Sequence, residues 1–422
     1  MTVADVLSFQ PVNRPRAIAN AGLDTSAFPA KARLALQVLE HIDHGALVVE
    51  CPDGQVAVFG SGVEPAAHMR IVDWTCFDAI LRSGDIGFAE GYIGGDWTTH
   101  DLPALLDVLV ANRTQIEAIY HGHWIGRLAY RLRHLLNRNS RRGSRRNIHA
   151  HYDIGNDFYR LWLDGGMTYS SALFEADAGA ADDQAIEAAQ TRKYRRMLEQ
   201  LRLTGGGSVL EIGCGWGGFA ELALADGFDI TGLTLSTEQL EYAQERCAPH
   251  VAPGQRCDLR LQDYRDCTGR FDGIVSIEMF EAVGEAYWPT YFAALRRLLV
   301  PGGHACIQTI TINDSRFARY RRGTDFIQQY IFPGGMLPSP SAFREQAAAA
   351  GLAVVDEIAF GLDYARTLDV WRQRFRQRLD AVRALGFDER FLRTWDFYLC
   401  YCAAAFRHRN TDVYQFTLRN PG

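Results

Sequence analysis

The segment from 209 to 218, VLEIGCGWGG, most constrains how this chain can fold. An apolar run ends in four glycines within six positions, and an apolar helical pattern follows. Glycine lets the backbone adopt left-handed conformations and lets a ligand approach without a clash against a Cβ atom. A strand that leads through such a turn into a helix is typical of sheets that bind a nucleotide-like cofactor. The segment therefore predicts an α/β sheet with a cofactor at this turn.

Strands and helices alternate in the sequence from about residue 150 onward. Apolar runs predict strands at 208–215, 228–236, 258–264, 271–279 and 304–312. Amphipathic patterns predict helices between them, for example at 237–247 and 287–299. Such a βαβ rhythm predicts a parallel sheet with helices on both faces.

The chain divides by pattern into three parts. Residues 1–120 predict a small N-terminal α+β domain, with strands around a turn at Asp53 and a helix at 101–119. Residues 121–147 predict a basic amphipathic segment and linker, and 148–422 a larger α/β domain that contains the glycine turn. The stretch 123–151 has eight arginines and no acidic residue. It is either an ordinary surface helix with a solvated loop or an element that binds anionic lipid headgroups.

The overall composition excludes several classes of function. The net charge of −6 gives no global basic field for nucleic acid. The nine cysteines include no CxxC pair, so we expect reduced thiols and no metal site. There is no run of 18 apolar residues and no signal-peptide pattern. We expect a cytoplasmic homodimer.

Further motifs surround the glycine turn in a fixed order. They are HYDIGNDFYRLWLDGGMTYSSALF (151–174), GLTLSTEQLEYAQER (232–246), SIEMFEAVG (276–284), YIFPGGMLPS (330–339) and CAAAFRHRNTDVYQF (402–416). Together they resemble the cyclopropane-fatty-acyl-phospholipid synthase and mycolic acid cyclopropane synthase family, which are class I S-adenosylmethionine (SAM) methyltransferases. The resemblance covers about 140–422, and 84–102 resembles the N-terminal domain of the longer bacterial members.

The resemblance implies a class I Rossmann-like fold, SAM as cofactor, and an unsaturated phospholipid in the bilayer as substrate. Members of this family transfer a methylene group to a cis double bond, so the enzyme would associate peripherally with the inner face of the membrane. The resemblance implies cofactor contacts at Tyr169, Ser170, Gly213, Gly215, Thr234, Leu235, Gln239, Asp263 and Tyr264. From the residues alone, the tyrosines could instead be core aromatics, and Thr234 to Gln239 could simply cap a helix.

The family's proton acceptor is a bound bicarbonate, and the resemblance carries its site over unevenly. Glu281 matches the residue that orients bicarbonate, Tyr364 the nearby tyrosine, and Ile310 the position that offers its backbone. Ser171 stands where the family usually has cysteine, and Gln308 where it usually has histidine. Serine and glutamine can donate hydrogen bonds to an anion, but they lack the charge and the proton transfer of imidazole.

Several alternatives stay open at this point. The product could be a cyclopropane, or a methyl- or methylene-branched acyl chain. The substrate could be an amine, as in plant-type N-methyltransferases, or the chain could be a non-catalytic lipid-binding protein. The apolar residues of 330–339 suit the wall of an acyl-chain tunnel. The aromatic helix predicted at 393–409 either lines the same tunnel or packs in the core.

Overall fold

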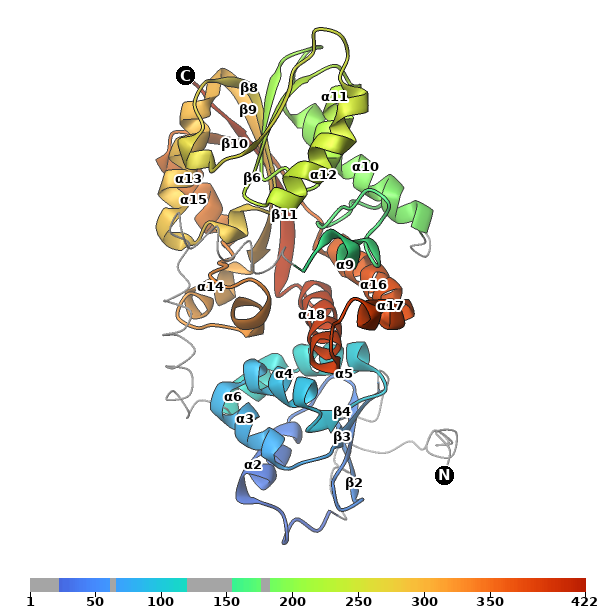
Figure 1. Ribbon diagram of the computed structural model, residues 1–422. Helices are drawn as coiled ribbons and strands as arrows, with labels where there is room; N and C mark the ends of the chain where they lie inside the picture. Colours follow the sequence, from blue (N-terminus) through green and yellow to red (C-terminus); the bar gives the residue numbers. More distant parts are fainter. Residues whose placement is uncertain (1–22, 61–65, 120–153, 176–182) are drawn as a thin grey trace.

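The computed structural model describes residues 23–60, 66–119, 154–175 and 183–422. The basic segment expected at 121–147 lies outside these residues. The described residues form a four-stranded sheet near the N-terminus and a seven-stranded sheet in the rest of the chain (Figure 1). In the described part, no helix is long and apolar enough to cross a lipid bilayer.

The first sheet has the strand order β2-β1-β3-β4. The elements of this unit are α2 (Ala30–Leu39), β1 (Ala46–Glu50), β2 (Val56–Gly60), β3 (Ala66–Ile71), α3 (Thr75–Ser83), α4 (Asp85–Gly94), β4 (Trp97–Thr98), α5 (Leu102–Ala111) and α6 (Arg113–Ile119). β1 pairs antiparallel with β2 and parallel with β3. Ala57 and Phe59 of β2 are buried while Val56 and Val58 are exposed, so one face of this sheet packs on the core.

The single helix expected at 101–119 is instead two helices, α5 and α6, which meet at Asn112. The buried Asn112 side chain accepts hydrogen bonds from the backbone N–H groups of Asp43 and His44, at 2.7 and 2.9 Å. Its amide nitrogen donates to the carbonyls of His44 and Val108. Asparagine side chains that bond to the backbone compete with helical geometry, and here that competition ends α5.

The second sheet has the order β10-β11-β9-β8-β5-β6-β7. Its strands are β5 (Ser208–Ile212), β6 (Asp229–Thr234), β7 (Cys257–Leu261), β8 (Phe271–Ile277), β9 (Leu299–Ile312), β10 (Ala353–Ala359) and β11 (Thr411–Arg419). The α-helices are α9 (Asn156–Arg160), α10 (Asp183–Gln200), α11 (Gly218–Ala225), α12 (Thr237–Cys247), α13 (Trp288–Leu298), α14 (Asp314–Tyr320), α15 (Pro340–Ala349), α16 (Gly361–Gln377), α17 (Leu379–Ala384) and α18 (Glu389–Arg407).

The prediction of a parallel sheet is confirmed for five strands, but the two pairings of β11 are antiparallel and make the whole sheet mixed. β7, β6, β5, β8 and β9 pair in parallel, but β11 runs antiparallel between β9 and β10. Thr411, at the start of β11, pairs with Ile312, at the end of β9. The chain therefore enters β11 from the end of the sheet where β9 finishes, and it must run the opposite way. The sequence prediction included neither β10 nor β11.

Helices cover both faces of the large sheet, as expected for this α/β class. α10, α11 and α12 lie on one side of it, and α13 and α15 on the other (Figure 1). α16, α17 and α18 lie between the large sheet and the N-terminal unit, where α18 packs on α4 and α5. Polar contacts join these parts, because Tyr401 Oη of α18 donates to Asp85 at 2.8 Å and Arg407 pairs with Asp107.

Candidate functional site

A cavity of about 1380 Å³ extends between the large sheet and the N-terminal unit. Its lining contains the glycine turn after β5, the ends of β6 and β8, and the apolar residues Leu47, Met69 and Phe77 of the N-terminal unit. Ligand pockets usually measure about 300–1,000 Å³, so this cavity has room for more than one bound group. The sequence-predicted site residues that line it are Tyr169, Ser170, Gly213, Gly215, Thr234, Leu235, Gln239, Asp263, Tyr264, Glu281, Ile310 and Tyr364. Ser171 and Gln308 are fully buried behind it.

The glycine turn requires glycine at alternate positions. Gly213, Gly215 and Gly217 have φ angles of 87°, 50° and 81°, in the left-handed region that L side chains rarely adopt. A Cβ atom on Gly213 would lie 2.9 Å from Cγ of Met279, whereas one on Gly215 would meet nothing within 4 Å. The N–H groups of Gly213 and Cys214 both donate to the carbonyl of Leu233, so the turn is held against the end of β6.

Next to the turn, Glu211 presents a buried carboxylate to the cavity. In the described part of the chain, its Oε2 atom has no hydrogen-bond partner. Burial raises its pKa well above the ordinary range, against the opposing charges of Arg246 and Lys193. An unpartnered buried acceptor beside a bare glycine turn fits a ligand that carries an ammonium group, and SAM carries one on its methionine part. The residues present therefore fit SAM, although the sequence analysis had not counted Glu211 among the contacts.

The predicted cofactor contacts after β6 also cap a helix. Ser236 is the N-cap of α12 and accepts from the N–H of Gln239 at 3.3 Å. The hydroxyl of Thr234 contacts Oε1 of Gln239 at 3.1 Å. The helix-capping interpretation is thus confirmed, while the cofactor contacts at Thr234, Leu235 and Gln239, which line the cavity as well, stay a prediction.

The predicted cofactor contacts Asp263 and Tyr264 lie at the cavity wall after β7. The Asp263 carboxylate accepts from the backbone N–H and from Nε of Arg265, at 3.0 and 2.8 Å. The Tyr264 ring lies at the cavity and packs edge-on against Tyr291, with 5.4 Å between centroids. The contact between the cofactor and Asp263 stays a prediction, and it would share the carboxylate with Arg265.

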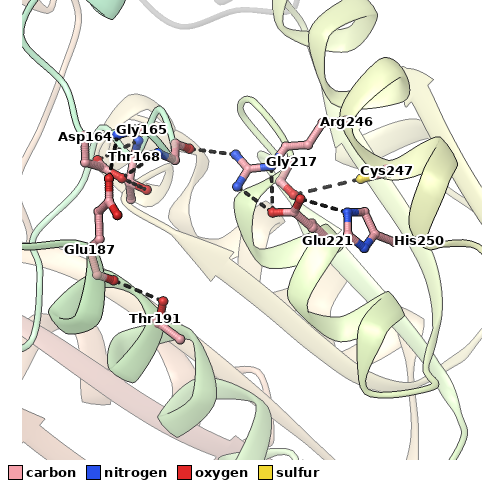
Figure 2. A network of polar contacts seen from close by, with 11 residues as sticks. Asp164, Gly165, Thr168, Glu187, Thr191, Gly217, Glu221, Arg246, Cys247 and His250 are labelled. Carbon is pink, nitrogen blue, oxygen red and sulfur yellow. Dashed lines mark hydrogen bonds and ion pairs between the residues drawn. The ribbon is translucent and has the colours of Figure 1, made fainter. Parts of the chain in front are cut away.

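A polar network fastens the loop that carries Tyr169 and Ser170 to the helices after the glycine turn (Figure 2). Arg246 Nη1 donates to the Gly166 carbonyl at 2.6 Å, while its Nη2 donates to Glu221 of α11 at 2.6 Å. Within the loop, Asp164 accepts from the N–H groups of Gly166 and Thr168, each at 3.0 Å. These hydrogen bonds fix the loop relative to the glycine turn, because Arg246 lies on α12 and Glu221 lies on α11.

Lys193 is a fully buried cation beside the site that the sequence analysis missed. Its Nζ donates to Oγ of Ser170 and to Oε1 of Gln190, both at 2.6 Å. Burial lowers its pKa to about 7, although nearby carboxylates, that of Glu278 foremost, act in the opposite direction. Helical spacing could have found it, because Lys193 follows Ile186 and Ala189 on the buried side of α10.

Glu278 directly follows β8. Its carboxylate accepts hydrogen bonds from three residues of the predicted bicarbonate site. Its Oε1 accepts from the backbone N–H of Ser171 and from Nε2 of Gln308, each at 2.8 Å. Its Oε2 accepts from the hydroxyl of Tyr364 at 2.6 Å. Three residues expected to hold bicarbonate thus hold a carboxylate of the chain itself. The Ser171 hydroxyl takes no part in this, since it donates to the Ala172 carbonyl.

The orientation of the Gln308 amide is set from outside the cavity. Arg196 of α10 donates to Oε1 of Gln415 at 2.7 Å, and Gln415 Nε2 donates to Oε1 of Gln308 at 3.0 Å. With its oxygen engaged by Gln415, Gln308 must turn its NH₂ group towards Glu278. Gln308 is therefore a fixed donor at this site.

Glu281 is a second carboxyl group at the cavity, one turn after Glu278. Its Oε1 accepts from the hydroxyl of Thr309 at 3.0 Å and from the backbone N–H of Ile310. Burial and the nearby Glu278 raise the pKa of Glu281 to about 8. A like charge in the same buried surroundings disfavours the ionised form, so Glu281 holds a proton at neutral pH. The Ile310 backbone, expected to contact bicarbonate, binds Glu281 instead.

The segments expected to form an acyl-chain tunnel lie partly on the cavity wall. Residues Ile327–Ile331 form a π-helix that overlaps the start of the 330–339 stretch. Phe332, Met336 and Leu337 line the cavity, whereas Tyr330 points its hydroxyl to Glu90. From α18, the lining residues are Tyr398, Tyr401, Cys402, Ala405 and Phe406. This helix therefore both packs in the core and lines the cavity.

Comparisons with known proteins show the family of this chain. A family model described as mycolic acid cyclopropane synthetase matches residues 139–416. The tuberculostearic acid methyltransferase UfaA1 of Mycobacterium tuberculosis is 43% identical over 347 residues, which cover 81% of each chain. The cyclopropane-fatty-acyl-phospholipid synthase of Escherichia coli K12 is 34% identical over 362 residues, covering 85% of this chain and 89% of the relative.

Solved structures give the same result. The mycolic acid cyclopropane synthase CmaA1, complexed with S-adenosylhomocysteine (SAH) and CTAB, matches with a TM-score of 0.60 and 33% identity. The match covers 65% of this chain and 98% of that one. Coclaurine N-methyltransferase bound to SAH matches with a TM-score of 0.58 at 18% identity, which shows the shared fold alone.

Proposed function

The chain belongs to the mycolic acid cyclopropane synthetase family and is a SAM-dependent enzyme of methylene or methyl transfer to lipid acyl chains, and from this premise we propose that its substrate is a phospholipid with a cis-unsaturated acyl chain. The product we propose is the cyclopropane. The observation that carries the proposal is the continuous cavity, which reaches from the glycine turn past Glu278 and Tyr364 to the apolar residues of the N-terminal sheet.

The volume and lining of this cavity suit a long hydrocarbon chain. Leu47 and Met69 of the N-terminal sheet are buried and line the cavity, although they lie far from the glycine turn in the sequence. A small amine would need neither this volume nor these apolar surfaces. An acyl chain gains about 0.8 kcal/mol for each buried CH₂ group, so a long apolar wall favours a lipid.

Positive charge on the same lining supports a phospholipid in particular. Arg113, Arg316, Arg319 and Arg322 all line the cavity, three of them within or directly after α14. Guanidinium groups bind phosphate oxygens with good geometry and keep their charge. We expect the lipid phosphate at these arginines, with one acyl chain directed towards Glu278.

The residues at the reacting centre suit the chemistry. SAM, when bound, supplies an electrophilic methyl group that the π electrons of the double bond can attack. The chain's own residues must then stabilise a positively charged acyl chain and accept one proton. Tyr169, Phe332 and Phe406 present aromatic rings at the cavity, and such rings attract cations. Burial of the site keeps out the water that would otherwise capture the cation.

A second candidate product is a methylene-branched chain. The observation in its favour is the 43% identity to the tuberculostearic acid methyltransferase UfaA1. Both products require the same methyl transfer and the loss of one proton. They differ in whether the freed electron pair closes a ring or forms a double bond to the new carbon after a hydride shift along the chain. A saturated methyl branch would need a further hydride donor.

The proposal can be tested with the full-length protein and methyl-labelled SAM. Vesicles of a cis-unsaturated phosphatidylglycerol should take up label and lose their double bond, whereas saturated vesicles with the same headgroup should not. Proton NMR of the lipid distinguishes cyclopropane protons from those of a methylene branch. Label in an added amine, or vesicle binding without any label, would overturn the proposal in favour of an N-methyltransferase or a non-catalytic lipid-binding protein.

A further inference from the structure

The bicarbonate that the family resemblance implies does not fit the site of this chain. Ser171, Gln308 and Tyr364, which should hold it, already donate to the two oxygens of Glu278. We propose that the Glu278 carboxylate takes the place of that anion and is the proton acceptor of the reaction, which makes the enzyme independent of bicarbonate. This inference rests on the proposed function.

The hydrogen bonds leave the carboxylate able to accept a proton. A carboxylate offers about four lone-pair positions, and the three donors use two on Oε1 and one on Oε2. One position on Oε2 remains, and Glu278 lines the cavity. In the reaction, a C–H bond of the transferred methyl group breaks, its proton binds Glu278, and its electron pair forms the final carbon–carbon bond.

The surroundings keep the charge on Glu278 and the proton on its neighbour. Glu278 receives three hydrogen bonds, whereas Glu281 receives two and its Oε2 has no partner in the described part of the chain. The buried Lys193 adds a favourable charge interaction to Glu278. Burial still raises the pKa of Glu278 above its ordinary value, and a carboxylate with a raised pKa is the better base at neutral pH.

The backbone at Glu278 is strained in a way that matches a functional position. Its φ angle is 48°, in the left-handed region, which costs a side chain with a Cβ atom about 1–2 kcal/mol. Such outliers persist where the surrounding structure holds them and they cluster at active sites. The same strain provides an experimental handle, because glycine adopts this conformation freely and would leave an empty space of carboxylate size.

The test uses the full-length protein, SAM and unsaturated phospholipid vesicles in buffer with and without bicarbonate. The wild type should transfer label at the same rate, within about twofold, in both buffers. Glu278→Gln should lose at least about 100-fold in rate, the usual contribution of a general base, while its SAM affinity stays within threefold by calorimetry. Glu278→Gly should be inactive without bicarbonate and regain activity as bicarbonate or formate is added. Glu245→Gln, exposed on α12, is the matched control and should behave as wild type.

A second readout does not depend on the lipid. Carbon-13 NMR of labelled bicarbonate with SAH-bound protein should show binding to Glu278→Gly and none to the wild type. If no lipid takes up label but this difference is seen, the proposed function fails and the placement of Glu278 stands. A wild-type enzyme that needs bicarbonate, a Glu278→Gln variant with normal rate, or a Glu278→Gly variant that neither binds bicarbonate nor is rescued by it would overturn the inference.

Discussion

Gly213→Ala should lower both the free energy of unfolding and the affinity for SAM. The geometry of the glycine turn gives the cause of each loss. A φ of 87° costs alanine about 1–2 kcal/mol. The new Cβ would also lie 2.9 Å from Cγ and 3.0 Å from Cβ of Met279, and overpacking of this kind costs about 1–3 kcal/mol. We therefore expect a loss of about 2–5 kcal/mol in the free energy of unfolding. Because Met279 also lines the cavity, its displacement should reduce SAM affinity.

Gly254→Ala is the matched control for this variant. Gly254 has a similar φ of 84°, but a Cβ atom there would meet nothing within 4 Å. It should therefore cost only the conformational part, about 1–2 kcal/mol, with unchanged SAM affinity. Urea denaturation followed by tryptophan fluorescence gives the two losses, and calorimetric titration gives the affinities. Equal losses in the two variants, or wild-type SAM affinity in Gly213→Ala, would refute the argument from close approach.

Other perturbations probe the proton, the cofactor loop and the cavity. The pKa of Glu281 is raised to about 8, so its contribution to stability is fully present below about pH 4.5 and is lost as the pH rises towards 8. Glu281→Gln should therefore gain stability relative to the wild type across this window, by at most about 1.4 kcal/mol per pH unit in urea denaturation. A difference in stability that does not change with pH would contradict the raised pKa. Arg246→Met removes the hydrogen bond to Gly166 and should raise the SAM Kd about tenfold, or about 1.4 kcal/mol, whereas Arg344→Met, in a surface pair, should leave the calorimetric Kd unchanged. Leu47→Trp fills the cavity beside the N-terminal sheet and should shift the product towards shorter acyl chains in mass spectrometry of mixed vesicles; an unchanged chain-length profile would show that the acyl chain lies elsewhere.

The parts of the fold that follow from local periodicity were predictable from sequence. The strand, glycine turn and helix at 208–225 recur as β5, the turn and α11. β11 was not predictable in this way, because its place depends on pairing with β9 over a distance of about a hundred residues. The break at Asn112 was also hidden, since its cause is a contact with Asp43 and His44, far away in sequence.

The candidate site shows a similar division. The resemblance brought Ser171, Gln308 and Tyr364 to one place, but it implied a bicarbonate between them and not a side chain of the protein itself. Glu278 has no role in the sequence-based predictions, because nothing in its neighbours along the chain marks its side chain as the common acceptor. That property arises only when β8, β9 and α16 are packed together.

The cavity draws its walls from two separate stretches of the chain. The groups that carry out the chemistry come from the large sheet and its loops, while Leu47, Met69 and Phe77 come from the first hundred residues. Mutations in the N-terminal stretch can therefore alter which lipids are accommodated without touching the reacting groups. Substitutions in the two stretches can therefore change the reaction rate and the choice of lipid almost independently of each other.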